Sequence, residues 1–176
     1  MLNIKSMIGA SLFAIGAMVA LSAFASSYTL APSTNTISGP TSLTYAGTVI
    51  PCTGIFTITI TATGTASVTA ATFGTNALCT SIKAQGLPWP IAPPTLVSAG
   101  VYAGAVTGVR LFIEALGVTC SQLSTDNVTI TLNTNASPHT ATFSGTLHSG
   151  TVPSPSMVAC PVNGGPFYTT IGVVYP

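Results

Sequence analysis

Two carboxylates and two histidines are the side chains of this sequence that could carry acid–base chemistry once the first 25 residues are set aside. They are Glu114, Asp126, His139 and His148. General acid–base catalysis needs ionisable groups within reach of one another, and a carboxylate pair would use every acid in the chain. The sequence also lacks the Gly-x-Ser-x-Gly turn that presents a nucleophilic serine. We therefore expect no catalytic residue and no enzymatic activity.

Simpler roles fit these four residues. Glu114 follows Arg110 by four positions in an alternating segment, so the two would share a strand face and partly neutralise each other. Asp126 stands at the start of an expected strand, where aspartate commonly organises a turn. The two histidines flank another expected strand, and metal binding would require a third ligand on a converging element. We expect surface histidines, no metal site and no cofactor.

Four cysteines, Cys52, Cys79, Cys120 and Cys160, form the other set of reactive side chains. An even number in a chain bound for an oxidising compartment indicates two disulfides. No two of them are closer than 27 positions, so the close ligand pairs of zinc motifs are absent. Three pairings are open. We favour the sequential one, Cys52 with Cys79 and Cys120 with Cys160, since each pair would bracket a run of consecutive strands.

The first 25 residues have the pattern of a secretory signal peptide. Lys5 precedes an apolar stretch over residues 7–24, and Ala23 and Ala25 supply the small-x-small cleavage pattern. The apolar run is also about long enough to span a bilayer, so a retained membrane anchor is the alternative. Cleavage would leave one secreted, extracellular domain. Only a leader that is not cleaved would attach this domain to a membrane.

Charged side chains are scarce in the rest of the chain. Two positive residues, Lys83 and Arg110, balance the two carboxylates, whereas an ordinary globular protein is about one quarter charged. Two cationic side chains could neutralise very few phosphates of a nucleic acid, so we expect no nucleic-acid partner. Charges also keep the exposed strand edges of different molecules apart. This chain must therefore stay in solution through its hydroxyl groups, or it associates.

Short alternating segments rich in threonine, valine and alanine are bounded by turn residues, which is typical of β-strands. The clearest strands are expected over 55–62, 108–116 and 127–133, with others near 65–73, 78–84, 140–147 and 167–174. Many short strands with glycine and proline turns indicate an all-β domain. We predict a single antiparallel β-sandwich of the Ig-like or Greek-key type over residues 41–176, stapled by two disulfides.

A proline-rich segment, Leu87–Pro94, contains the only tryptophan, Trp89. Proline donates no hydrogen bond to a sheet, so this segment is predicted to be a loop or an extended edge segment. Two roles are open for Trp89. It caps the sandwich core beside the disulfide of Cys79, or it forms an exposed apolar contact together with Leu87 and Ile91.

Residues 26–40 are polar and weakly patterned, so we predict a flexible arm or a strand donated to a neighbouring molecule. Its apolar anchors would be Tyr28, Leu30 and Ile37. A donated strand adds to an exposed sheet edge through main-chain hydrogen bonds.

Several segments resemble a family of secreted bacterial proteins described as activators of alkane oxidation (PraB-like). The most specific segment is Leu78–Trp89, which reads LCTSIKAQGLPW. A GPTSLT run at 39–44, a strand ending near Cys52 and a VTC at 118–120 fit as well. The resemblance implies an extracellular protein linked to growth on hydrocarbons and to biofilm or surface association, and it supplies no catalytic motif.

Two functions are consistent with these observations. The first is a secreted structural protein that self-associates through its strand edges into a fibre or biofilm matrix, with itself as the partner. The second is an interfacial protein that binds hydrocarbon, an abiotic surface or another apolar ligand and promotes alkane uptake or oxidation. The missing charge leads us to rank self-association first.

Overall fold

The structure, a computed structural model, describes residues 26–29, 33–123, 126, 128–150 and 157–174. These residues form fourteen β-strands and two short helices, α1 and a 3-10 turn η1. In chain order the elements are β1 (Ser27–Thr29), β2 (Ser33–Tyr45), β3 (Thr48–Ile60), β4 (Ala66–Gly74), α1 (Ala77–Thr80), β5 (Ile82–Gln85), β6 (Trp89–Ile91), β7 (Thr95–Ser98), β8 (Val101–Val106), β9 (Arg110–Ile113), η1 (Glu114–Leu116), β10 (Val118–Ser121), β11 (Val128–Asn133), β12 (His139–Ser149), β13 (Val158–Thr169) and β14 (Gly172–Val174). No helix in these ranges is long and apolar enough to cross a membrane.

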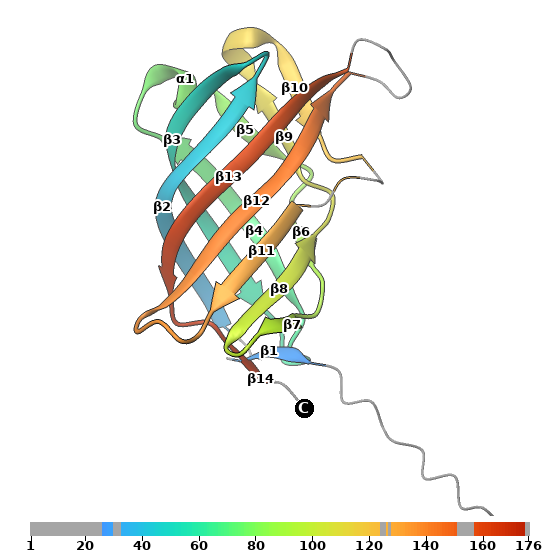
Figure 1. The fold of residues 1–176 in the computed structure, drawn as a ribbon. Helices are drawn as coiled ribbons and strands as arrows, with labels where there is room; N and C mark the ends of the chain where they lie inside the picture. The colour runs from blue at the N-terminus through green and yellow to red at the C-terminus, as the bar shows by residue number, and fades with distance from the viewer. Residues whose placement is uncertain (1–25, 30–32, 124–125, 127, 151–156, 175–176) are drawn as a thin grey trace, which may run out of the picture.

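Eight of the strands form a closed antiparallel barrel (Figure 1). Around the wall the order is β11, β8, β6, β4, β3, β2, β13 and β12, and the ring closes because β12 also pairs with β11. The closing ladder runs from Val128 opposite Gly145 to Asn133 opposite Thr140. The predicted all-β class is confirmed, but the β-sandwich is wrong. Strands of a sandwich and of a barrel both alternate a buried and an exposed face, so the alternation could not separate the two architectures.

One face of each long strand lines the barrel interior. In β3 every second residue from Ile50 to Ile60 is buried, while Thr57 and Thr59 lie on the outer face. In β11 the same alternation buries Val128, Ile130 and Leu132. These two strands match the sequence expectation, because a strand with one face in a core repeats its apolar residues with a period of two.

At the upper end in Figure 1 the wall divides. β12 pairs with β11 as far as Gly145 and then with β10 at His148 and Ser149. β9 and β5 follow β10 in the sheet. Two predicted strands are shorter than expected here: the segment 108–116 ends in η1 after Ile113, and the segment 78–84 begins with α1 before β5.

Two disulfides hold this upper end together. Cys52 of β3 is bonded to Cys79 of α1, and Cys120 of β10 is bonded to Cys160 of β13. This is the sequential pairing that the sequence favoured. Disulfides persist in oxidising compartments, so the pair indicates an environment such as the extracellular space or a periplasm.

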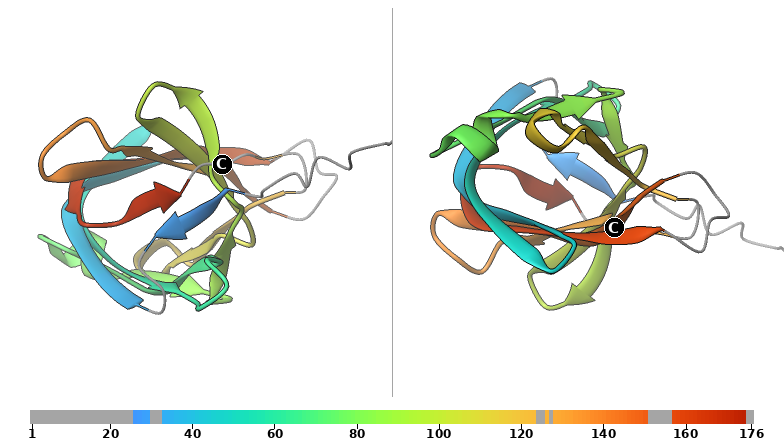
Figure 2. Two further views of the ribbon diagram at one scale, coloured as in Figure 1. Left: turned by 90° about the horizontal axis from the view of Figure 1, so that it is seen from below. Right: turned by 90° about the horizontal axis from the view of Figure 1, so that it is seen from above.

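The lower end is covered by a separate two-stranded sheet of β1 and β14, which lies across the opening of the barrel (Figure 2). Residues 33–40, part of the arm predicted over 26–40, are the first part of β2 and pair with β3. Tyr28 and Ile37, two candidates for a donated strand, are 7% and 1% exposed inside the barrel of their own chain. Leu30 and the leader over 1–25 lie outside the described residues.

The prediction of a loop or edge segment is wrong for the centre of the proline-rich segment, whereas residues 87–88 and 92–94 lie outside any strand. Trp89–Ile91 forms β6, which lies within the wall between β4 and β8. The strand has only three residues, and its register with β8 consists of Ile91 opposite Val106. The carbonyl of Pro90 still accepts a hydrogen bond from the amide of Thr107. The proline therefore costs the wall only the bond of its missing amide hydrogen.

Candidate ligand cavity

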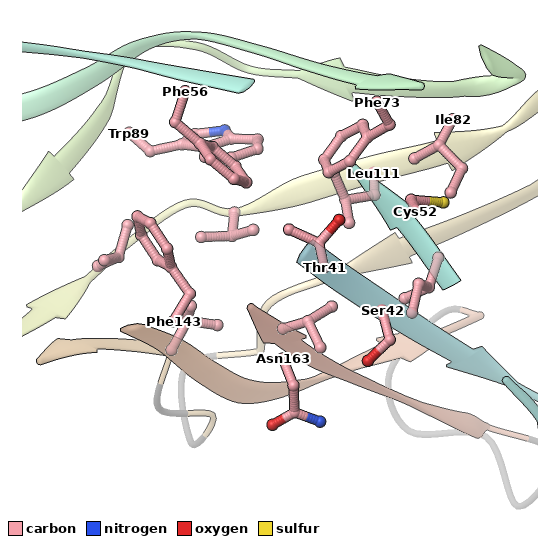
Figure 3. A pocket seen from close by; sticks show the side chains of 15 residues that line it. Thr41, Ser42, Cys52, Phe56, Phe73, Ile82, Trp89, Leu111, Phe143 and Asn163 are labelled. Atoms are coloured by element: carbon pink, nitrogen blue, oxygen red, sulfur yellow. The ribbon is translucent and has the colours of Figure 1, made fainter. Parts of the chain in front are cut away.

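An apolar cavity of about 60 Å³ lies in the upper half of the barrel. Aromatic and aliphatic side chains from the barrel strands and from β5 and β9 surround it, as Figure 3 shows. Its lining comprises Thr41, Ser42, Leu43, Cys52, Phe56, Phe73, Ile82, Trp89, Val106, Val109, Leu111, Val128, Phe143, Val162 and Asn163. No lining side chain carries a charge, so the chemistry of the cavity is that of an apolar binding site.

Phe56 of β3 lines this cavity and is the centre of an aromatic cluster. Its ring centroid lies 4.9 Å from that of Phe143, 5.5 Å from that of Phe167 and 5.8 Å from that of Phe73. Most of these contacts are edge-to-face, the arrangement that aromatic quadrupoles favour. Three inward-facing glycines make room for the rings. A Cβ atom at Gly54 would lie 2.7 Å from Phe56 Cε2, and one at Gly39 or Gly164 would lie within 2.9 Å of Phe167.

Thr41 lines the cavity with a hydroxyl group that is turned into the barrel. Figure 3 shows its hydroxyl directed toward Phe73 and Leu111, whereas the side chains of Ser42 and Asn163 are directed away from the cavity. The Thr41 hydroxyl oxygen is buried and, among the described residues, has no hydrogen-bond partner. Buried polar groups are normally hydrogen-bonded, so this hydroxyl calls for an explanation.

Hydrogen bonds fix the wall around the cavity. The indole Nε1 of Trp89 donates to the carbonyl of Gln85 at 2.9 Å, which holds the ring in the interior. Gln122 connects two lining residues: its Oε1 accepts from the amide of Val109 at 3.1 Å, and its Nε2 donates to the carbonyl of Val106 at 2.9 Å. These bonds span the turn between β8 and β9, where the wall divides.

A second apolar cavity of about 20 Å³ lies in the lower half, where Tyr28, Ile91 and Ile171 are among the lining residues. The Tyr28 hydroxyl donates to the carbonyl of Ala92 at 3.1 Å. It fits there because Gly104 is a glycine: a Cβ atom at that position would lie 2.3 Å from the hydroxyl oxygen. Burial raises the pKa of Tyr28 above its ordinary value.

The exposed apolar contact predicted for the proline-rich segment does not form. Trp89 and Ile91 are 3% and 5% exposed and line the upper and the lower cavity respectively. Leu87 is partly buried and packs against the core. Trp89 and Ile91 contribute to the interior because they are alternate residues of β6, a wall strand.

None of the four acid–base candidates, Glu114, Asp126, His139 and His148, lines either cavity. Glu114 pairs with Lys83 at 3.6 Å, and the predicted pairing with Arg110 is wrong because the strand ends before Glu114. Asp126 Oδ2 accepts from the amide of Leu123, the turn-forming role that we expected, and also lies 2.9 Å from His148 Nδ1. Within the described ranges no three histidine, cysteine, aspartate or glutamate side chains are grouped as metal ligands are.

Sequence reasoning missed most of the cavity. Phe56 stood on the apolar face of a predicted strand, but nothing connected it with Phe73, Phe143 or Thr41. Thr41 is brought into the cavity by register, since it lies opposite Cys52 on one side and opposite Gly164 on the other. The usable signal was the glycine at position 54 between alternating apolar residues, because a strand glycine marks a close approach of neighbouring atoms.

Comparison with known proteins gives one match. The family model described as "Alkane oxidation protein activator PraA/PraB-like" matches residues 1–170. Neither the curated proteins nor the solved structures contain a significant match.

Proposed function

The chain belongs to the PraA/PraB-like family of alkane oxidation protein activators, and from this premise we propose that it is an exported, non-catalytic protein that binds an alkyl chain inside its barrel. The apolar cavity between Phe56, Trp89 and Phe143 is the observation that supports this proposal. The proposal keeps the apolar-ligand function considered from the sequence, but it moves the ligand from a surface patch to the interior.

The size of the cavity determines how much of a ligand would fit. An apolar cavity of about 150 Å³ takes up benzene, whereas this cavity measures about 60 Å³. It would therefore accept the end of a chain and not a whole long alkane. Burial of a methylene group contributes about 0.8 kcal/mol, so three or four of them would contribute about 2–3 kcal/mol.

An alkyl-binding protein outside the reducing cytosol would act as an activator without performing chemistry itself. It would raise the amount of hydrocarbon that is held in water and delivered to the cell, because the bound chain end is removed from contact with water. The scarcity of ionisable groups near the cavity is in keeping with such a role.

Tryptophan fluorescence tests the proposal, because Trp89 is the only tryptophan of the chain and lines the cavity. We expect a saturable change in Trp89 emission on titration with n-heptane. Val109→Phe, which fills the cavity, should abolish the change. Val49→Phe, at a position that is 59% exposed on the outer face, should leave it intact. An absence of saturation, or an equal response of the Val109→Phe variant, would refute binding in the cavity.

Self-association is a second candidate function, and the edge strand β7 supports it. Within the described sheet β7 pairs with β8 alone, and Leu96 and Val97 on it are 45% and 64% exposed. Its free edge carries no lysine that would discourage pairing with another molecule. Light scattering at rising protein concentration tests this: Val97→Lys should lower the measured mass, and Val49→Lys should not. A monomer at all concentrations would rule out association through β7.

A further inference from the structure

We propose that the preferred ligand of the cavity is an alkyl chain that ends in a hydroxyl group, an alkan-1-ol, and that the Thr41 hydroxyl binds its head. This inference rests on the proposed alkyl-binding function and specifies the ligand class. It starts from the Thr41 hydroxyl, which is buried without a partner among the described residues in an otherwise apolar interior. An unpaired buried hydroxyl is unfavourable, and a ligand hydroxyl would supply the missing bond.

Packing fixes which branch of the Thr41 side chain faces the cavity. Its methyl carbon Cγ2 lies against two glycines: a Cβ atom would be 2.6 Å away from it at Gly54 and 2.9 Å away at Gly164. Only glycines leave room for the methyl group on that side. The other branch of the side chain, the hydroxyl, is consequently directed toward Phe73 and Leu111 (Figure 3).

The lining has no charged side chain, and this decides which head group of an alkyl ligand is favoured. A carboxylate would be buried beside Thr41 with no cation among the lining residues, which is costly for an ionised group. A plain alkane would leave the Thr41 hydroxyl unpaired. A hydroxyl can both donate one hydrogen bond and accept another, so it pairs with Thr41 and brings no charge.

The proposed ligand class indicates which kind of reaction must supply the ligand. Hydroxylation of the terminal carbon of an alkane yields an alkan-1-ol, and a further oxidation consumes it. The reaction that supplies this ligand is therefore a terminal hydroxylation. The protein would bind the first oxidised form of the chain in preference to the hydrocarbon itself.

Trp89 fluorescence titrations with 1-hexanol, n-heptane and hexanoate at pH 7 test the inference in three proteins. The wild type should bind 1-hexanol most tightly. Thr41→Val, which replaces the hydroxyl by a methyl group of similar size, should weaken 1-hexanol binding about threefold to tenfold and leave n-heptane binding unchanged. Thr36→Val, on the exposed outer face of the same strand, should bind all three as the wild type does.

The outcomes separate this inference from the function on which it rests. If n-heptane binds and Thr41→Val weakens 1-hexanol alone, the inference is supported. If n-heptane and 1-hexanol bind equally well and Thr41→Val changes neither, the hydroxyl preference is refuted while alkyl binding stands. If none of the three compounds binds the wild type, both proposals fail.

Discussion

The rings of Phe56 and Phe143 lie 4.9 Å apart at a tilt of 31°, one from β3 and the other from β12. The two strands are not neighbours in the wall, since β2 and β13 lie between them. The contact therefore crosses the barrel interior, and both rings line the upper cavity. Side chains therefore connect two strands of the wall that are too far apart to share main-chain hydrogen bonds.

We expect Phe56→Ala to destabilise the protein by about 3–5 kcal/mol, the usual cost of removing a core phenylalanine. The lost ring would also enlarge the upper cavity. Chemical denaturation measures the change, with Tyr168→Ala as the control, since Tyr168 is 65% exposed and should change the free energy of unfolding by less than about 0.5 kcal/mol. Equal effects of the two variants would contradict the central role of Phe56.

Thr41→Val and Thr169→Val should differ in their effect on stability. Thr41 has an unpaired hydroxyl, so its loss should leave the melting temperature unchanged or raise it. Thr169 is 5% exposed, and its hydroxyl accepts the amide of Ile171 at 3.0 Å. Its replacement leaves that amide unpaired and should cost about 1–3 kcal/mol. Thermal unfolding of the two variants compares them directly, and a larger loss at position 41 would be evidence against an unpaired hydroxyl.

Gly54→Ala should be destabilising although alanine is a mild change. The new Cβ atom would lie 2.6 Å from Thr41 Cγ2 and 2.7 Å from Phe56 Cε2, so side chains on both strands would have to move. We expect a loss of about 1–3 kcal/mol, as for other overpacked cores. Gly74→Ala is the matched control because a Cβ atom there meets nothing within 4 Å. Similar unfolding free energies for both variants would refute the tight packing at Gly54.

The double variant Cys120→Ala, Cys160→Ala should lose about 2–5 kcal/mol, the usual cost of removing a native disulfide from a secreted domain. The bond closes a loop of 40 positions and ties β10 to β13. Reduction of the wild type should lower its melting temperature in the same direction. A melting temperature that is insensitive to both treatments would show that the upper end is stable without this bond.

Tyr28 should make stability fall at alkaline pH. Burial raises its pKa in the folded state above the unfolded value of about 10. Its contribution is therefore complete below pH 10 and is lost as the pH rises beyond it. Tyr28→Phe loses the hydrogen bond to the carbonyl of Ala92, so its free energy of unfolding at pH 8 should be lower than that of the wild type. At pH 11 the two free energies of unfolding should lie closer together. A difference that does not depend on pH would contradict a buried Tyr28 hydroxyl.

The sequence predicted strands better than it predicted their arrangement. The alternation in 55–62 and 127–133 placed Ile58 and Ile130 correctly in the core, since a buried face leaves a local pattern. Closure of the barrel depends on the pairing of Val128 with Gly145, which has no local signature. The proline rule excluded a wall position for Trp89–Ile91. The strand Trp89–Ile91 is an exception, because it has only three residues and the Pro90 carbonyl still accepts a hydrogen bond.

The candidate site was harder to predict than the fold. Trp89 attracted notice as the single tryptophan, but its burial could not be distinguished from exposure without the neighbouring strands. Thr41 resembled every other threonine of the chain. Only the register of β2 against β3 and β13 turns its side chain inward, beside Cys52 and Gly164.

The small sheet across the lower opening constrains the order of folding. Ser27 of β1 faces Val174 of β14, so the first and the last described strands meet there. The small sheet at the lower end cannot form until nearly the whole chain has been synthesised. The Cys52–Cys79 disulfide requires only the first half of the chain. Contacts between such distant parts of a chain form slowly. The barrel therefore closes its lower opening last, and a chain that is cut short before residue 172 would leave its lower core open to water.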